Sequence, residues 1–215
     1  MRNVVVVDYG MGNLLSVQRA FEQCGARIII TSSPNAVERA ECLVLPGVGA
    51  FADGMRELHS RGLVEAIRKF AKTGRPFMGI CLGMQMMMET SEEFGIYEGL
   101  ALIDGRVTMI PRAGSDGKPH KIPHIGWNGL LLPKNREDWN NTIFQDLSKG
   151  ESVYFVHSFS VAPENPVNDL ADCDYNGLSI CAAIQAGNVY GCQFHPEKSG
   201  PVGLKIIKNF LKIHQ

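Results

Sequence analysis

The sequence predicts an α/β protein with a mostly parallel central sheet flanked by helices, followed by a second half of mixed or antiparallel strands. Up to residue 93, short apolar runs alternate with amphipathic segments in the order βαβαβαβα. This alternation is the pattern of parallel strands joined by helices that cover both faces of a sheet. We expect residues 1–215 to form a single domain, because this length is ample for one hydrophobic core.

The first two strand–helix units occupy the start of the chain. Residues 4–7 are all valine, which is typical of a strand buried on both faces. The loop 8–13 (Asp-Tyr-Gly-Met-Gly-Asn) leads into an amphipathic helix over residues 14–24. Its Gly-x-Gly lacks the third glycine of a dinucleotide site and is weak evidence for nucleotide binding. Residues 27–31 are the second strand, and Ser33-Pro34 begins a short helix.

The third unit carries a glycine-rich turn. Residues 42–45 are a strand followed by Pro46-Gly47-Val48-Gly49. Two glycines directly after a strand allow backbone N–H groups to turn toward a ligand. An ordinary strand–helix turn is the alternative. The apolar residues of segment 63–72 fall on one face and predict the next helix.

The fourth unit places a cysteine at a sharp turn. Residues 76–80 are an apolar strand opened by proline, and residues 82–89 are rich in good helix formers. Cys81 stands between them, with Gly79 and Gly83 two residues away on either side. Small neighbours relieve the crowding at such a turn, and Gly-x-Cys-x-Gly is the cysteine form of a nucleophile elbow.

Two effects would activate a thiol at this position. The N–H groups at the start of a helix favour the thiolate of Cys81. The N–H of Leu82 points to where an oxyanion would form. The alternative is that Cys81 is a small buried residue of the core, since free cysteine is among the most buried residue types.

The second half of the chain reads as strands linked by turns. Turn signals lie at residues 174–177 and at Gly187-Asn188, and the latter pair is expected to close a hairpin. Residues 111–119 are a polar loop, and residues 201–213 form a final amphipathic helix. The expected strands cover residues 100–107, 121–132, 152–161, 179–185 and 188–194.

Composition excludes several classes of function. The formal net charge of −1 implies no basic face, so we expect no nucleic-acid partner. The apolar run at residues 4–7 is too short for a signal peptide, and no run reaches transmembrane length, so we expect no membrane association and a cytoplasmic location. The six cysteines show no Cys-x-x-Cys spacing, which predicts reduced thiols and no zinc site.

A cysteine nucleophile needs a histidine to move protons. His59 and His214 fall in helical segments and are expected at the surface, and prolines argue against a helical metal site at His120 and His124. His157 ends an apolar strand and is a core or rim residue. His195 is the best candidate, because Pro196 stops its strand and Glu197 lies within reach of the imidazole. The alternative for this segment is a surface turn.

Three motifs together carry a resemblance over nearly the whole chain. The sequence is similar to the class I (triad) glutamine amidotransferases, and more narrowly to the glutaminase subunits of imidazole glycerol phosphate synthases. This resemblance implies a flavodoxin-like fold. The narrower match is supported by segments 89–93, 123–128 and 154–158. The three motifs are Pro46-Gly-Val-Gly49, Gly79-Ile-Cys-Leu-Gly-Met-Gln85 and Gln193-Phe-His-Pro-Glu-Lys-Ser199.

The resemblance implies hydrolysis of L-glutamine to glutamate and ammonia without a metal or organic cofactor. Cys81 would attack the side-chain amide, His195 would carry the proton and Glu197 would orient the imidazole. The oxyanion would be held by the Leu82 N–H and a backbone N–H of Gly47, Val48 or Gly49. The family positions that contact the substrate match Gly49, Gln85, Glu93, Ser158 and Phe159.

The resemblance also implies a protein partner. In the family, ammonia passes to a (β/α)₈ cyclase subunit within a heterodimer, for an imidazole-forming step of histidine biosynthesis. We expect the isolated chain to hydrolyse glutamine poorly, because the flexible Gly47-Val48-Gly49 loop would need the docked partner to rotate a peptide. Local packing is an alternative explanation for a Trp-Asn pair at a strand end. The positions that match the partner surface are Gly12, Asn13, His124, Trp127, Asn128, Tyr154 and Lys198.

Two alternatives stay open. The loop over residues 111–121 is longer and more polar than the family pattern, which allows a paralogue that feeds a related synthase, such as one on an amidino-sugar pathway. A cysteine peptidase of similar fold would use the same Cys81 and His195. The combination of Gln85 with the Gly47–Gly49 turn favours a small amino-acid amide over a peptide.

Overall fold

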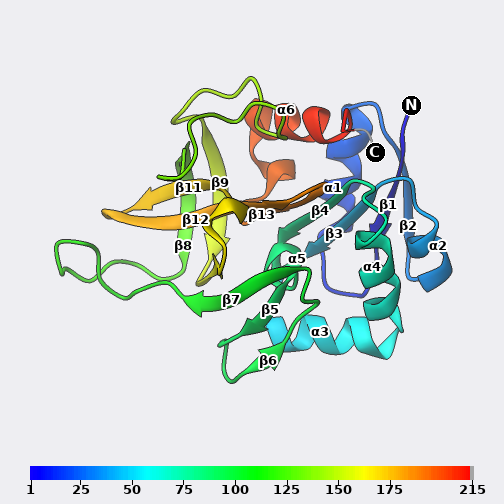
Figure 1. Ribbon diagram of the computed structural model, residues 1–215, viewed down its shortest axis with the longest axis horizontal. Helices are drawn as coiled ribbons and strands as arrows, with labels where there is room; N and C mark the ends of the chain where they lie inside the picture. Colours follow the sequence, from blue (N-terminus) through cyan, green and yellow to red (C-terminus); the bar gives the residue numbers. More distant parts are fainter. Residues whose placement is uncertain (214–215) are drawn as a thin grey trace.

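The computed structural model describes residues 1–213, which form two sheets with helices packed on their faces (Figure 1). Within these residues the large sheet has nine strands, in the order β2-β1-β3-β4-β13-β12-β11-β8-β9. Their bounds, in chain order, are β1 (Asn3–Val7), β2 (Arg27–Thr31), β3 (Leu43–Gly47), β4 (Phe77–Cys81), β8 (His124–Leu131), β9 (Ser152–His157), β11 (Asp169–Tyr175), β12 (Leu178–Ala186) and β13 (Val189–Cys192).

A smaller sheet and the helices complete the described part of the chain. The small sheet has the order β10-β7-β5-β6. Its strands are β5 (Met88–Ser91), β6 (Tyr97–Glu98), β7 (Ile103–Met109) and β10 (Phe159–Pro163). The α-helices are α1 (Leu14–Gln23), α2 (Pro34–Glu38), α3 (Phe51–Ser60), α4 (Leu63–Ala71), α5 (Leu82–Gln85) and α6 (Gly200–Phe210), and the 3₁₀ helices are η1 (Pro166–Asn168) and η2 (Pro196–Lys198).

The direction of the strands changes midway across the large sheet. β1 pairs in parallel with β2 and β3, β3 with β4, and β4 with β13, whereas the neighbours from β13 to β9 are antiparallel. The order 2-1-3-4 followed by β13 is that of a flavodoxin-like sheet whose fifth strand comes from the end of the chain. The predicted fold class, with its antiparallel second half, is confirmed.

Helices cover both faces of the parallel strands, as the valine run in β1 predicts. Val4 and Val6 pack in one apolar cluster with residues of α1 and α6, and Val5 and Val7 pack in another with residues of α2, α3 and α4. In Figure 1, α1 and α6 lie together on one side of the sheet, and α3 and α4 lie on the other. Cys81 lies at the carboxyl edge of the parallel strands, as the last residue of β4.

The bounds of helix α3 were not predicted, although His59 was expected in a helical segment. Its buried residues Phe51, Gly54, Met55 and Leu58 follow helical spacing, but the glycine lowers helix propensity. A Cβ at position 54 would lie 2.8 Å from the sulfur of Met86. Glycine is therefore used here because α3 passes close to the segment that follows the cysteine elbow.

The second half differs from the prediction in three places, and the first is the short strand β6, which was not predicted. The strand expected over residues 152–161 is two strands, β9 and β10, because the chain leaves the large sheet at Ser158 and enters the small one. Strand β11 was not predicted, since three aspartates lower its β propensity, but pairing with β12 and β8 holds it in the sheet. The predicted hairpin at Gly187-Asn188 joins β12 to β13 and is confirmed.

The remaining expectations concern two histidines and one loop. His59 is exposed on α3, as expected. The loop over residues 111–119 lies between β7 and β8 and is largely exposed. The expectation for His214 concerns a residue outside the described range.

We expect Phe21→Ala to lower the free energy of unfolding by about 3–5 kcal/mol, because it opens a cavity in a filled core. Phe21 is fully buried on α1, and its ring meets the edge of Phe210 on α6 at a centroid distance of 6.2 Å. Leu15→Ala on the same helix is the control, since Leu15 is 55% exposed. Urea denaturation of both variants measures the difference, and equal losses would contradict this account of the core.

Candidate functional site: a cysteine elbow and a histidine–glutamate pair

Cys81 lies at a strained turn at the end of β4. Its φ of 54° is in the left-handed region, which non-glycine residues rarely adopt. The surrounding structure must hold such a conformation, which costs on the order of 1–3 kcal/mol and is concentrated at functional sites. The strand Phe77–Cys81 is buried throughout, and α5 starts at the next residue. The turn therefore has the geometry expected of a nucleophile elbow.

The two glycines around Cys81 are required by close packing. A Cβ at position 79 would lie 2.8 Å from the backbone of Gly83. A Cβ at position 83 would lie only 1.8 Å from the carbonyl oxygen of Leu45 on the neighbouring strand β3. Side chains at either position would push the elbow away from the sheet, so the small neighbours relieve crowding as the sequence indicates.

The helix after Cys81 is much shorter than predicted. The expected helix over residues 82–89 is wrong beyond Gln85, because α5 ends there and the chain enters β5. The segment after β6 occupies the carbonyl groups that a longer helix would use. The N–H groups of Leu100 and Leu102 donate to the carbonyls of Met86 and Met87. One helical turn has only a small dipole, so the helix start contributes less to thiolate stability than the sequence analysis assumed.

His195 and Glu197 form a buried pair at the end of β13. Nδ1 of His195 lies 2.8 Å from Oε1 of Glu197, and the two side chains are 3% and 2% exposed. The short helix η2 turns Glu197 back toward the ring. Ser199 holds the backbone in place, since its hydroxyl donates to the His195 carbonyl and accepts from the Tyr154 N–H. The expected contact between Glu197 and the imidazole is present.

Parallel pairing brings the imidazole to the thiol. Burial alone would lower the pKa of His195, but hydrogen bonding to Cys81 and Glu197 outweighs it and raises this pKa to about 9. Nε2 is buried with no hydrogen-bond partner within residues 1–213, and His195 lines the same cavity as Cys81. The ring is therefore protonated at neutral pH.

The thiol and the imidazole open into a cavity of about 410 Å³. Of the residues predicted to contact substrate, Val48, Gly49, Leu82, Gln85, Glu93, Ser158 and Phe159 line this cavity. Gly47 lies just behind it as the last residue of β3, and is paired with Cys81 across the sheet. The structure therefore gathers the predicted catalytic and substrate residues from five separate segments at one edge.

Gln85 and Glu93 both line the cavity and are held by hydrogen bonds. Both hydrogen bonds of the Gln85 amide nitrogen go to protein acceptors: the Phe159 carbonyl at 3.0 Å and Oε1 of Gln193 at 3.1 Å. Neither bond uses the amide oxygen of Gln85. The Glu93 carboxylate accepts from the Phe51 N–H at 2.6 Å, which ties it to the start of α3. Two oriented acceptor groups therefore face a common space.

The glycine turn after β3 does not present its N–H to the cavity in this conformation. The Val48 N–H donates to the Met11 carbonyl at 3.2 Å. Gly49 has a φ of 106°, a value that L side chains rarely adopt. Rotation of the peptide between Gly47 and Val48 would free this N–H.

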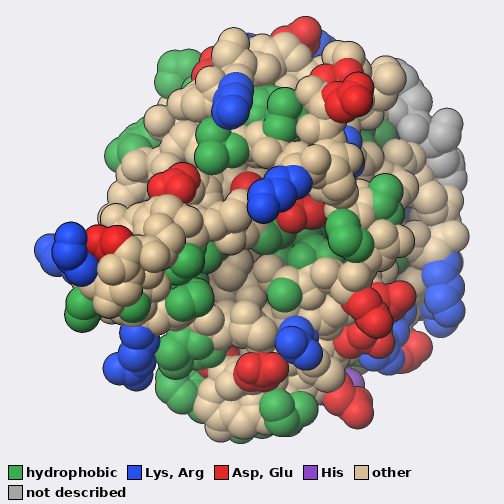
Figure 2. Space-filling view, turned by 60° about the vertical axis from the view of Figure 1, so that its left-hand side comes forward, with side chains coloured by type: hydrophobic (Ala, Val, Ile, Leu, Met, Phe, Trp, Pro, Cys, Tyr) green, Lys and Arg blue, Asp and Glu red, His purple; other side chains and the backbone are tan. Residues whose placement is uncertain are grey.

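The residues predicted to meet a partner differ in exposure. Trp127 is 59% exposed and packs edge-on against Tyr154, its neighbour across β8 and β9. Lys198 is exposed on η2. In the face drawn in Figure 2, hydrophobic side chains lie among interspersed acidic and basic ones, with no single block of basic charge.

Four other predicted partner residues have local structural roles or are less exposed. His124 is buried and donates to or accepts from His157 at 3.1 Å, so it faces the core rather than the surface. Asn128 donates to the Asp174 carbonyl and accepts from the Gly129 N–H, which is the local packing considered as the alternative. Asn13 accepts from the Ser16 N–H and caps α1. Gly12 is half-buried beside Pro46.

The family follows from a comparison of the whole chain with known proteins. The glutamine amidotransferase class-I family model matches residues 5–213. The chain belongs to this family. Subunit HisH 1 of imidazole glycerol phosphate synthase from Legionella pneumophila (strain Paris) is 55% identical over 213 residues, covering 99% of this chain and 100% of the relative. The HisH subunit from Geobacter sulfurreducens is 46% identical over 211 residues, covering 98% of each chain.

Solved structures agree with the fold. The structure of PurLQS from Thermotoga maritima covers 98% of each chain with a TM-score of 0.72 at 24% identity. A crystal structure of a glutamine amidotransferase gives a TM-score of 0.71 at 17% identity, covering 97% of each chain. At these identities the likeness supports the class I glutamine amidotransferase architecture alone.

Two polar residues of the site were given no role from the sequence. Gln193 donates from Nε2 to the Cys81 sulfur at 3.8 Å, and His157 lines the cavity. Gln193 could have been found, because it stands two residues before His195 in the strand expected over residues 188–194, and alternate residues of a strand point to the same side. His157 carried no comparable signal, since its position depends on where β9 leaves the sheet.

All six cysteines are unpaired. No helix within residues 1–213 combines the length and apolar character needed to cross a bilayer.

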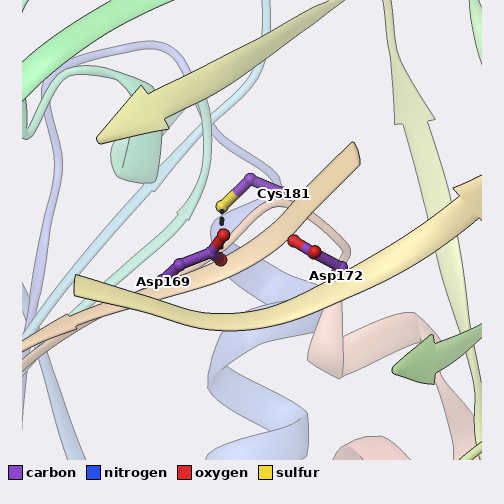
Figure 3. A group of neighbouring side chains, drawn as sticks. All are labelled: Asp169, Asp172 and Cys181. Carbon is purple, nitrogen blue, oxygen red and sulfur yellow. Dashed lines mark hydrogen bonds between the residues drawn. The ribbon is translucent and has the colours of Figure 1, made fainter. Parts of the chain in front are cut away.

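A second group of side chains, Asp169, Asp172 and Cys181, lies apart from the Cys81 cavity on β11 and β12 (Figure 3). Their ligating atoms are within 4.8 Å of one another. The Cys181 thiol donates to Asp169, and the Ser179 hydroxyl donates to Asp172. Burial and the nearby Asp172 charge raise the pKa of Asp169 to about 7. Sequence reasoning missed the group, because pairing of two strands assembles it.

We expect Asp169→Asn to stabilise the protein more at pH 8 than at pH 5. A raised pKa means that the folded state binds the proton more tightly than the unfolded state. The carboxyl therefore costs stability as the pH rises from about 4 to about 7, and this cost is full above that range. The melting temperature at both pH values measures the effect, with the exposed Asp104→Asn as the control. An equal shift at pH 5 and pH 8 would contradict the assignment.

Proposed function

We propose that this chain is a glutaminase subunit that hydrolyses L-glutamine and passes the ammonia to a cyclase that makes imidazole glycerol phosphate, in histidine biosynthesis. The observation that carries the proposal is the Cys81 elbow facing a buried His195–Glu197 pair in one cavity. Membership of the class I family and the HisH names of relatives at 44–55% identity support the assignment. The unpaired cysteines fit a reducing compartment, which supports the cytoplasm.

The reaction uses the protonated state of His195. The Cys81 thiolate attacks the side-chain amide carbon of glutamine, and the imidazolium gives its proton to the departing ammonia. Neutral His195 then takes a proton from water, which attacks the thioester and releases glutamate and the free thiol. Glu197 holds Nδ1 throughout, so that Nε2 carries the proton between sulfur, nitrogen and water.

The oxyanion of each tetrahedral intermediate needs backbone donors. The Leu82 N–H follows the nucleophile directly, and the Val48 N–H would be the second donor after its peptide rotates. Gln85 offers its amide oxygen to the substrate amide, and Glu93 offers a carboxylate to the α-ammonium group. These roles account for the polar groups that line a cavity large enough for one amino acid.

The triad is tested by steady-state glutaminase assays with the cyclase present. Cys81→Ser should reduce kcat by more than ~10³, because the oxygen nucleophile has no matched activation. Glu197→Gln should reduce kcat less and should lower the pKa of His195, since one of the groups that raise it is neutralised. The ring pKa is read by NMR titration. Full activity in Cys81→Ser, or peptide cleavage in place of ammonia release, would refute the proposal.

The partner surface is proposed to lie around Trp127, Tyr154 and Lys198, next to His195. Docking there would favour the rotated Gly47–Val48 peptide, because the Val48 N–H is otherwise held by Met11. The proposed complex is a heterodimer with a (β/α)₈ cyclase.

We expect the isolated chain to turn over glutamine slowly, with a large increase when the cyclase is added. Trp127→Ala should weaken cyclase binding by roughly tenfold or more, since exposed tryptophans often anchor interfaces. Val167→Ala, at an exposed site on η1, is the control. Calorimetry gives the affinity and ammonia release gives the stimulation. Equal turnover with and without the cyclase would count against the partner-dependent loop. Glutamine-dependent product formation with an amidino-sugar synthase, and none with the cyclase, would assign the chain to the amidino-sugar pathway.

A further inference from the structure

A buried side-chain amide touches the catalytic sulfur. Gln193 directly follows β13 and is fully buried. Its Nε2 donates to Sγ of Cys81 at 3.8 Å, within hydrogen-bond range for sulfur. Strand pairing explains the contact: Cys192 pairs with Ile80 in parallel register, so the residues that follow this pair, Gln193 and Cys81, lie close together.

The orientation of this amide follows from its neighbours. The Phe159 carbonyl can only accept, and it accepts from Nε2 of Gln85 at 3.0 Å. The same nitrogen of Gln85 donates to Oε1 of Gln193 at 3.1 Å. With its oxygen used in this way, Gln193 turns its NH₂ group to the thiol.

A histidine pair supports the other end of this chain of hydrogen bonds. Nδ1 of His157 donates to the same Phe159 carbonyl at 2.9 Å, and its Nε2 lies 3.1 Å from Nδ1 of His124. Burial lowers the pKa of His157 to about 4, so the ring is neutral at neutral pH and its Nε2 accepts from His124. The rings of Phe155 and Tyr175 stack on His124. The amides are thus held by rigid, buried groups.

We propose that Gln193 is a further catalytic residue, whose amide N–H stabilises the Cys81 thiolate and fixes the sulfur between His195 and the substrate cavity. The inference rests on the proposed function for its catalytic consequence. A donor to the charged form of an acid favours that form, and a buried donor acts more strongly than a solvated one. The short α5 contributes little, so the thiolate depends more on side-chain donors such as Gln193.

The test compares Gln193→Met with the wild-type protein in complex with its cyclase. Methionine keeps the length of the side chain and removes the donor. We expect kcat to fall by about 10- to 100-fold with KM changed less than about threefold, which corresponds to loss of one hydrogen bond to a charged group. The pH profile of Cys81 alkylation by iodoacetamide, read by peptide mass spectrometry, should move to higher pH.

A matched control separates catalysis from folding. Gln185→Met removes another hydrogen-bonded amide of the same sheet, one that donates to the Tyr190 hydroxyl and lies away from the thiol. Its alkylation profile should match the wild type. If Gln193→Met does not fold, Gln193→Glu takes its place: it keeps the acceptor for Gln85 but sets an acidic group beside the sulfur, and should move the alkylation profile further to high pH.

The outcomes are distinct. A Gln193 variant with an unchanged alkylation profile would overturn the proposal and leave Gln193 a packing residue. A shifted profile with a KM effect in place of a kcat effect would also overturn it, because the amide would then act on substrate binding. If the wild-type protein releases no ammonia from glutamine while the profile still shifts, the proposed function fails and the activation of the thiol by Gln193 stands.

Discussion

The parallel pairing of β4 with β13 is the contact on which the site depends. It joins a strand from the first half of the chain to one near its end, and its register sets Ile80 beside Cys192. The thiol lies one residue after Ile80, and the Gln193 amide, the imidazole and the Glu197 carboxylate lie one to five residues after Cys192. A slip of one residue would turn these side chains to the opposite face, so the buried valines and phenylalanines that fix the register also fix the chemistry.

The same cavity holds two histidines with opposite ionisation. Burial by itself acts to lower the pKa of both imidazole rings. For His195 the thiol and the Glu197 carboxylate overcome this effect, and the pKa rises to about 9. His157 has only a carbonyl and another histidine as partners, and its pKa falls to about 4. One ring is thereby suited to carry a proton, and the other to hold a neutral network in place.

The site combines rigid and adjustable parts. Cys81, His195 and the amide pair are buried and cross-linked by hydrogen bonds from several strands. The Gly47–Gly49 turn is different, because its middle residue is 43% exposed and its N–H is bonded to a neighbouring loop. The proposed oxyanion site would therefore need a local peptide rotation and not a rearrangement of the core, which is a small change for the proposed partner to favour.

The sequence alone determined the strand–helix alternation, the sharp turn at Cys81 with its two glycines, and the His195–Glu197 contact, because each depends on neighbours along the chain. It overestimated the helix after Cys81, gave no bounds for α3, missed β6 and β11, and gave no role to Gln193. Those features depend on groups that are distant in the sequence. The N–H groups of residues 99–103 bind the carbonyls that follow α5 and so end that helix. Close packing against Met86 requires a glycine at position 54 of α3, and the pairing of β4 with β13 brings Gln193 to Cys81. Tertiary structure decided them, since local propensity is weak compared with hydrogen bonds and packing supplied by the rest of the fold.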